Sequence, residues 1–270
     1  MDHWNPKGAF AQRNRPDVLA GAFQQGVGRV NSCRSKVNIA PTNNGYSLSL
    51  RCMESVASRY RKVVEQLAAG VILVAVTKTR SIEELKDLYD CGHRIFGENR
   101  VQELLEKKPQ LPNDVSWHLI GTLQTNKVKQ VLPHVALIHS VDRLSLLECI
   151  DKEAGKLGIK AHLLLQVHIA SEETKHGFSE EELRELIKEP LSTRFPNVEV
   201  LGLMGMATFT EDEKQVRDEF KSLFRLYTQA RALHPAWSIL SMGMSGDYQL
   251  AMEEGSNMVR VGSALFGPRS

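Results

Sequence analysis

The chain has 270 residues, of which 42% are hydrophobic and 24% charged, and this composition is ordinary for a globular protein. No apolar run approaches the roughly 18 residues that a membrane-spanning helix needs, so we expect no membrane partner. The net charge is +2, but residues 1–52 hold seven Lys or Arg against two Asp, which makes that segment +5 and the remainder −3. The remainder therefore lacks the basic field of a nucleic-acid-binding protein.

The four cysteines are Cys33, Cys52, Cys91 and Cys149, and no two of them form a C-x-x-C pair. The nine histidines show no H-E-x-x-H or other paired metal spacing. These patterns predict reduced thiols in a cytoplasmic protein, with neither a structural disulfide nor a metal site.

Residues 1–52 differ from the rest of the chain because they are rich in Asn, Gly, Arg and Ser and have no sustained periodicity. The pattern predicts a disordered, dispensable extension, and its low acid content also resembles an organellar transit peptide. If any part binds nucleic acid, it is this basic segment. An amphipathic helix pattern starts at Met53, so we place the folded domain at residues 53–270.

Strands and helices alternate from Met53 onward. Branched apolar runs predict strands, and 3.6-residue periodicity predicts helices. The strands are predicted at 71–78, 94–97, 117–121, 136–141, 162–169, 198–206, 237–242 and 258–262. The helices are predicted after Ser81 as N-cap and at 101–107, 125–131, 143–157, 180–188, 213–233 and 248–254. Eight such repeats favour a single α/β domain of the (β/α)₈ TIM type, with an open doubly wound sheet as the alternative.

Lys78 ends the first apolar strand. The active face of such a barrel lies at the carboxyl ends of its strands. Partial burial of a lysine there disfavours the ammonium and leaves an amine that can form a Schiff base with an aldehyde. The alternative is a lysine whose ammonium simply reaches solvent from the strand end. Position alone does not separate the two.

Two glycine-rich segments follow the last two strands, S-M-G-M-S-G-D at 241–247 and R-V-G-S at 260–263. Each alone is also typical of a turn. Backbone N–H groups there, with the hydroxyls of Ser245 and Ser263, can hold a phosphate dianion. Closure of a barrel makes strand eight a neighbour of strand one and of Lys78. One small molecule with an aldehyde and a phosphate is pyridoxal 5′-phosphate (PLP), so the combination predicts this cofactor.

Six motifs, in order and at the expected spacing, resemble one known family. They are V-A-V-T-K at 74–78, F-G-E-N-R-V-Q-E at 96–103, W-H-L-I-G-T-L-Q-T-N-K at 117–127, K-H-G at 175–177, S-M-G-M-S-G-D at 241–247 and V-R-V-G-S-A-L-F-G at 259–267. With them, residues 53–270 resemble the pyridoxal phosphate homeostasis proteins, whose fold resembles the N-terminal barrel of alanine racemase. The resemblance implies PLP fold-type III without the C-terminal β domain, and a role in intracellular PLP (vitamin B6) homeostasis.

The resemblance also assigns residues to the cofactor. It implies a Schiff base on Lys78, phosphate contacts from Ser245, Gly262 and Ser263, Arg260 at the pyridine nitrogen, and further cofactor contacts from Asn99, His118 and Met242. Two of these have simpler interpretations from their positions. Asn99 could cap the helix that starts at Val101, and His118 could be a buried histidine whose hydrogen bonds are satisfied within the protein.

Two functions fit this pattern: a carrier that supplies or buffers PLP, and a fold-type III enzyme such as an amino-acid racemase. An arginine at the pyridine nitrogen weakens the electron sink that PLP catalysis needs, although alanine racemase also uses one. The sequence ends at Ser270, soon after the last strand, so we expect the protein to lack the domain that supplies the tyrosine base of that racemase. We therefore expect no catalytic residues and no strong turnover, with Tyr248 only a wall of the site. We also expect a monomer, with PLP-dependent apoenzymes as acceptors.

Overall fold

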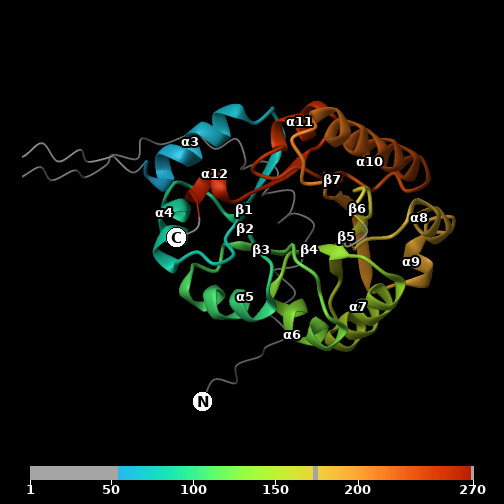
Figure 1. Ribbon diagram of the computed structural model, residues 1–270. Helices are drawn as coiled ribbons and strands as arrows, with labels where there is room; N and C mark the ends of the chain where they lie inside the picture. The colour runs from blue at the N-terminus through green and yellow to red at the C-terminus, as the bar shows by residue number, and fades with distance from the viewer. Residues whose placement is uncertain (1–53, 173–175, 269–270) are drawn as a thin grey trace, which may run out of the picture.

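A computed structural model describes residues 54–172 and 176–268. Eight parallel strands close into a barrel in chain order, β1 to β8, with helices around it (Figure 1). The strands are β1 Ile72–Val76, β2 Ile95–Glu98, β3 Ser116–Leu119, β4 Leu137–Val141, β5 Ala161–Val167, β6 Val198–Gly205, β7 Ile239–Ser241 and β8 Met258–Val261. The closed sheet confirms the predicted (β/α)₈ barrel and excludes the open doubly wound sheet.

Ten α-helices lie within the described residues. They are α3 Val56–Gln66, α4 Ile82–Asp90, α5 Val101–Lys107, α6 Val128–Val131, α7 Leu144–Leu157, α8 Glu180–Leu186, α9 Leu191–Arg194, α10 Glu213–Leu233, α11 Tyr248–Glu253 and α12 Ser263–Phe266. Ser81 caps α4 through a capping box with Glu84, as its sequence position predicts. The predicted helix 125–131 begins instead as a 3₁₀ turn over Thr125–Lys127, and two short helices, α9 and α12, were not predicted.

Strand residues alternate between the inside of the barrel and the layer beneath the helices. Val74, Leu164 and Met204 belong to an apolar cluster inside the barrel. Ala75, the neighbour of Val74, packs with Phe96 in a second cluster under the helices. Because successive side chains of a strand point to opposite faces of the sheet, the position of a residue in its strand determines whether it faces the barrel interior or the helices.

The last described residues pack against the first. Helix α12, red in Figure 1, lies beside α3, which is blue. The Arg59 guanidinium on α3 donates to the carbonyl oxygens of Leu265 at 2.8 Å and Phe266 at 3.0 Å. The predictions for residues 1–52, and for Met53 as the start of the domain, lie outside the described residues.

None of the helices in the described part of the chain has both the length and the apolar stretch that crossing a bilayer would require. In the same residues, no group of three or more His, Cys, Asp or Glu side chains is placed to bind a metal ion.

Candidate functional site

Four of the eight predicted site residues, Lys78, Asn99, Gly262 and Ser263, lie just after the carboxyl ends of three adjoining strands, β1, β2 and β8. Lys78 is half-buried and follows β1 by two residues, so the strand ends earlier than the predicted residue 78. Strand β1 pairs with β8 in a register that sets Val74 opposite Arg260. A Cβ atom built on Gly262 would lie 3.3 Å from the carbonyl oxygen of Val76. Barrel closure therefore brings the Lys78 segment next to the glycine-rich segment after β8, as predicted.

Ser245 connects the two glycine-rich segments. Its Oγ accepts hydrogen bonds from the backbone N–H of Gly262 at 3.0 Å and of Ala264 at 3.5 Å. Gly243 makes the turn that presents Ser245, because its φ is +94° and an added Cβ would lie 2.6 Å from the Cβ of Ala251. A hydroxyl and two amides thus converge where α12 begins, and such a group suits a phosphate.

Arg260 is 3% exposed and lies inside the barrel below this point. Its guanidinium donates to the carbonyl oxygen of Ser241 at 2.9 Å, to the Ser241 Oγ at 2.7 Å and to the carbonyl oxygen of Gly205 at 2.9 Å. Burial lowers the pKa of Arg260 to about 10, against an opposing effect of Asp247, so the side chain stays charged at neutral pH. A guanidinium has five N–H groups, so after these three bonds it still has donors for a ligand.

His118 lies in the same interior, on β3, and is 1% exposed. Its Nδ1 is 3.0 Å from the Nε2 of His139, and the Nδ1 of His139 is 3.3 Å from the Ser241 Oγ. Burial lowers the pKa of His118 to about 3 and that of His139 well below its ordinary range, so both rings are neutral at neutral pH. The interpretation of His118 as a buried, satisfied histidine fits this geometry.

Sequence reasoning missed His139 and Ser241 as members of this hydrogen-bonded chain. A signal existed, because both residues fall on inward-facing positions of their strands under the period-two rule. Polar residues at such positions of a barrel interior need partners, and these residues supply them to one another and to Arg260.

Asn99 follows β2 directly, at the barrel mouth. Helix α5 has Arg100 at its N-cap and no side-chain capping bond, so the capping interpretation of Asn99 is wrong. The Oδ1 atom of Asn99 is buried and has no hydrogen-bond partner among the described residues. A buried acceptor without a partner is costly, so its position at the mouth favours a ligand that donates to it.

The structure separates the Met242 side chain from the other predicted site residues. Its side chain is fully buried in the apolar cluster between the strands and the outer helices. The neighbouring Ser241 points into the barrel, where Arg260 and His139 contact it. Only the backbone of Met242 is therefore suitably placed to take part in a site at the mouth.

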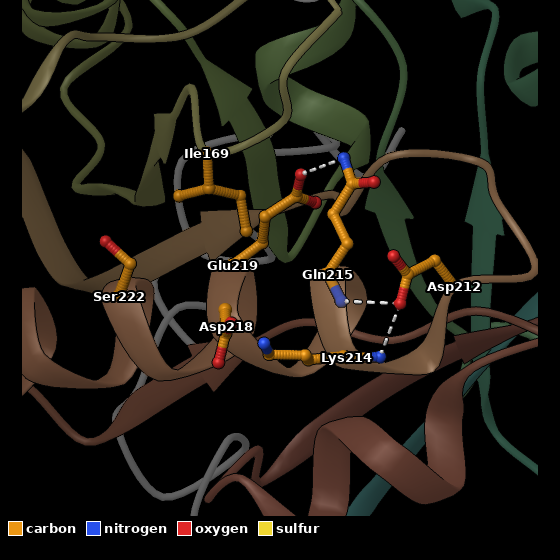
Figure 2. Close-up of a pocket in the computed structure, with 7 residues that line it drawn as sticks. All are labelled: Ile169, Asp212, Lys214, Gln215, Asp218, Glu219 and Ser222. Atoms are coloured by element: carbon orange, nitrogen blue, oxygen red, sulfur yellow. Dashed lines mark hydrogen bonds between the residues drawn. The ribbon is translucent and has the colours of Figure 1, made fainter.

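A groove also lies at the start of α10 (Figure 2), and none of the predicted site residues lines it. Asp212, Asp218 and Glu219 line it, with Lys214 as the single basic residue of its lining. Three carboxylates repel a phosphate, so this groove does not suit a phosphorylated cofactor.

Residues 52–270 match the family model for the alanine racemase N-terminal domain. A pyridoxal phosphate homeostasis protein of Aquifex aeolicus is 42% identical over 222 residues, which are 80% of this chain and 96% of the relative. A Schizosaccharomyces pombe protein of the same name is 33% identical over 226 residues, 81% of this chain and 92% of the relative. The chain belongs to the pyridoxal phosphate homeostasis protein family.

Solved structures agree with this family assignment. PipY of Synechococcus elongatus, solved with PLP bound, is 35% identical and superposes with a TM-score of 0.72 over 79% of this chain and 100% of PipY. Alanine racemase of Bartonella henselae has a TM-score of 0.64, but it is 22% identical and only 58% of its chain is covered. The racemase likeness therefore shows a shared barrel fold and nothing further.

Proposed function

We propose that this protein carries PLP as a Schiff base on Lys78 and supplies or buffers it in intracellular vitamin B6 homeostasis. One observation carries the proposal: the Lys78 segment, the unpartnered Asn99 oxygen and the Ser245 hydroxyl with its two amides lie around one barrel mouth, with Arg260 buried in the barrel beneath them. The names of the relatives and the PLP bound to PipY support it.

PLP supplies an aldehyde that reacts with amines and a phosphate that anchors it. The Lys78 amine would condense with the aldehyde, form a C=N bond and release the carbonyl oxygen as water. Ser245, Gly262 and Ser263 would hold the phosphate, and Asn99 would lie near the cofactor face. Arg260 would donate to the pyridine nitrogen. In this arrangement His118 supports Arg260 through His139 and Ser241, and Met242 contributes its backbone.

We further propose that the protein does not turn over amino acids at enzyme-like rates. An arginine at the pyridine nitrogen keeps that nitrogen unprotonated and so stabilises a carbanion poorly. The tyrosines among the described residues are also engaged elsewhere. The Tyr248 hydroxyl bonds to Gln66, and the Tyr89 hydroxyl lies 2.8 Å from Asp114. Tyr227 is 5% exposed in the outer core, and Tyr60 packs edge-on against His93.

The remaining parts of the proposal concern the cellular setting. A cytoplasmic monomer that passes PLP to dependent apoenzymes, and binds neither membrane nor nucleic acid, fits a domain of charge −3 with reduced thiols. Residues 1–52 have no role in this scheme.

Absorbance and mass spectrometry test the central assignment. Purified protein mixed with PLP should develop a near-visible absorbance band that borohydride removes. Peptide mapping after reduction should find the pyridoxyl group on Lys78. Finding it instead on Lys127 or Lys129, on the segment after β3, would refute the assignment, and absence of any reducible band would refute carriage as a Schiff base.

A further inference from the structure

Behind Lys78, on the helix side of the sheet, lies a buried ammonium that no part of the proposed PLP site uses. Lys107, the last residue of α5, is 7% exposed. Its Nζ donates to the carbonyl oxygen of Thr77 at 2.7 Å, to the Glu98 Oε1 at 2.8 Å and to the Glu103 Oε1 at 2.6 Å. One cation thus joins the ends of β1 and β2 to α5.

The same carboxylates hold both neighbours of Lys78. The Thr77 hydroxyl donates to the Glu98 Oε1 at 2.6 Å, and the Thr79 backbone N–H donates to the Glu103 Oε1 at 2.6 Å. Lys78 lies between these two threonines. The segment that carries the proposed PLP lysine is therefore fixed on each side, and both attachments lead to Lys107.

Thr79 shows that the backbone of this segment is held in a strained conformation. Its φ is +63°, and it is the single non-glycine residue with positive φ in the described part of the chain. A β-branched residue is strained in this left-handed region. Such strain persists only where surrounding contacts impose it, and it is typical of functional sites. The bond from the Thr79 N–H to Glu103 is a contact of that kind.

Stability alone does not account for the cluster. Glu98 is fully buried, and its Oε2 has no hydrogen-bond partner among the described residues. Burial raises the pKa of Glu98, against the opposing effects of Lys107 and Thr77. Buried ion pairs of this type are often no more stabilising than apolar side chains of similar size. A role in positioning explains why charges are retained there.

We propose that Lys107 and Glu103 are positioning residues for PLP attachment. Through Thr77 and Thr79 they keep the turn in its strained form and thereby hold the Lys78 amine toward the barrel mouth. This inference rests on the proposed function, because it assumes that Lys78 is the residue that PLP modifies.

The first test uses Glu103→Ala, with Glu106→Ala as the matched control, because Glu106 is an exposed carboxylate on the same helix. Displacement of a reacting group by about 1 Å can cost on the order of 100-fold in rate. We expect Glu103→Ala to slow formation of the reducible PLP band at least about tenfold and to weaken PLP binding. Glu103→Gln, which keeps an acceptor for Thr79, should restore part of the loss, and Glu106→Ala should match the parent.

Thr79→Gly separates positioning from general stability. Glycine adopts positive φ without strain, so the turn no longer depends on Glu103 to hold it. We expect Glu103→Ala to slow PLP attachment much less when Thr79→Gly is also present. Equal losses in both backgrounds would overturn the strained-turn part of the inference.

A double variant that removes both buried charges separates an effect on PLP attachment from an effect on folding. Lys107→Met alone leaves the buried Glu98 carboxylate without its ion-pair partner and is expected to unfold the protein. Glu98→Met with Lys107→Met removes both charges and should keep the thermal midpoint of the PLP-free protein while slowing PLP attachment about tenfold or more. PLP attachment at the parental rate in this pair and in Glu103→Ala would overturn the inference and leave the proposed function standing. If the parent itself carries no reducible PLP on Lys78, the proposed function fails instead.

Discussion

The Nδ1 atom of His118 lies 3.0 Å from the Nε2 atom of His139 in the closed interior of the barrel. One arrangement of protons satisfies the whole chain: Arg260 donates to Ser241, Ser241 to His139, His139 to His118, and His118 to the Ser116 Oγ, 3.4 Å away. Each ring then donates once and accepts once. In this arrangement each ring accepts one hydrogen bond, which requires both histidines to be neutral, and burial lowers the pKa of both rings.

This requirement predicts acid sensitivity. Burial lowers the pKa of His118 to about 3 and of His93 to about 4, from an ordinary value of 6.5. The unfolded chain therefore binds more protons than the folded one at pH values below about 6.5, and stability falls as the pH decreases through that window. The loss is roughly 1.4 kcal/mol per pH unit for each such histidine.

Urea unfolding measured from pH 8 to pH 5 checks the expectation. Glu98 acts in the opposite direction, because its raised pKa makes the folded state bind the extra proton. The lowered pKa values of three buried histidines, His93, His118 and His139, outweigh the raised pKa of one carboxyl group. We therefore expect a net fall in the free energy of unfolding as the pH decreases. His93→Gln, which keeps a donor for the Ile95 carbonyl oxygen, should make the pH dependence shallower. A flat profile over this range would contradict the neutral-histidine assignment.

Ser241→Ala should interrupt the chain at its centre. The substitution removes an acceptor for Arg260 and a partner for His139, both of which are buried. Loss of a hydrogen bond to a buried charge typically costs about 1.5–3 kcal/mol. We expect a decrease of that size in the free energy of unfolding, with weaker PLP binding. Ser238→Ala, at an exposed position three residues earlier, serves as the control and should leave both quantities unchanged.

Lys78→Ala should abolish covalent attachment of PLP without removing all affinity. The phosphate contacts proposed for Ser245, Gly262 and Ser263 would remain. Equilibrium dialysis should therefore detect residual, borohydride-insensitive binding that inorganic phosphate competes away. Lys129→Ala, at an exposed lysine, is the control. Unchanged covalent labelling of the Lys78→Ala variant would place the Schiff base on another residue.

Removal of residues 1–52 should have little effect. Those residues are polar, aperiodic and +5 in charge, whereas a regular pattern starts at Met53. A chain that begins at Met53 should keep its thermal midpoint and its affinity for PLP. A large decrease in either quantity would show that residues 1–52 contribute to the domain or to its site.

The sequence predicts the barrel well because its signals are local. Apolar runs of strand length, and caps such as Ser81, depend on neighbouring residues. The ends of the strands are less predictable, because β1 stops at Val76 while the extended pattern runs on to Lys78. The Glu98–Lys107 pair and the His139–Ser241 contact were not predicted. The residues of the second contact are separated by 102 positions and meet only after the barrel closes.

The last prediction concerns turnover: PLP-loaded protein should not convert amino acids at enzyme-like rates. Arg260 would keep the pyridine nitrogen unprotonated, because its pKa of about 10 leaves it a donor at neutral pH. Stereospecific reprotonation of a carbanion would also need a second general base, and the Tyr248 hydroxyl is bonded to Gln66. Enzymes typically turn over at about 1–10³ per second, so the comparison has a wide margin. Loaded protein would be incubated with each proteinogenic amino acid while chirality, keto-acid formation and α-proton exchange are followed. Turnover of any amino acid at an enzyme-like rate would contradict the carrier hypothesis and favour a racemase-like enzyme. Slow α-proton exchange, equal to that of free PLP, agrees with a carrier.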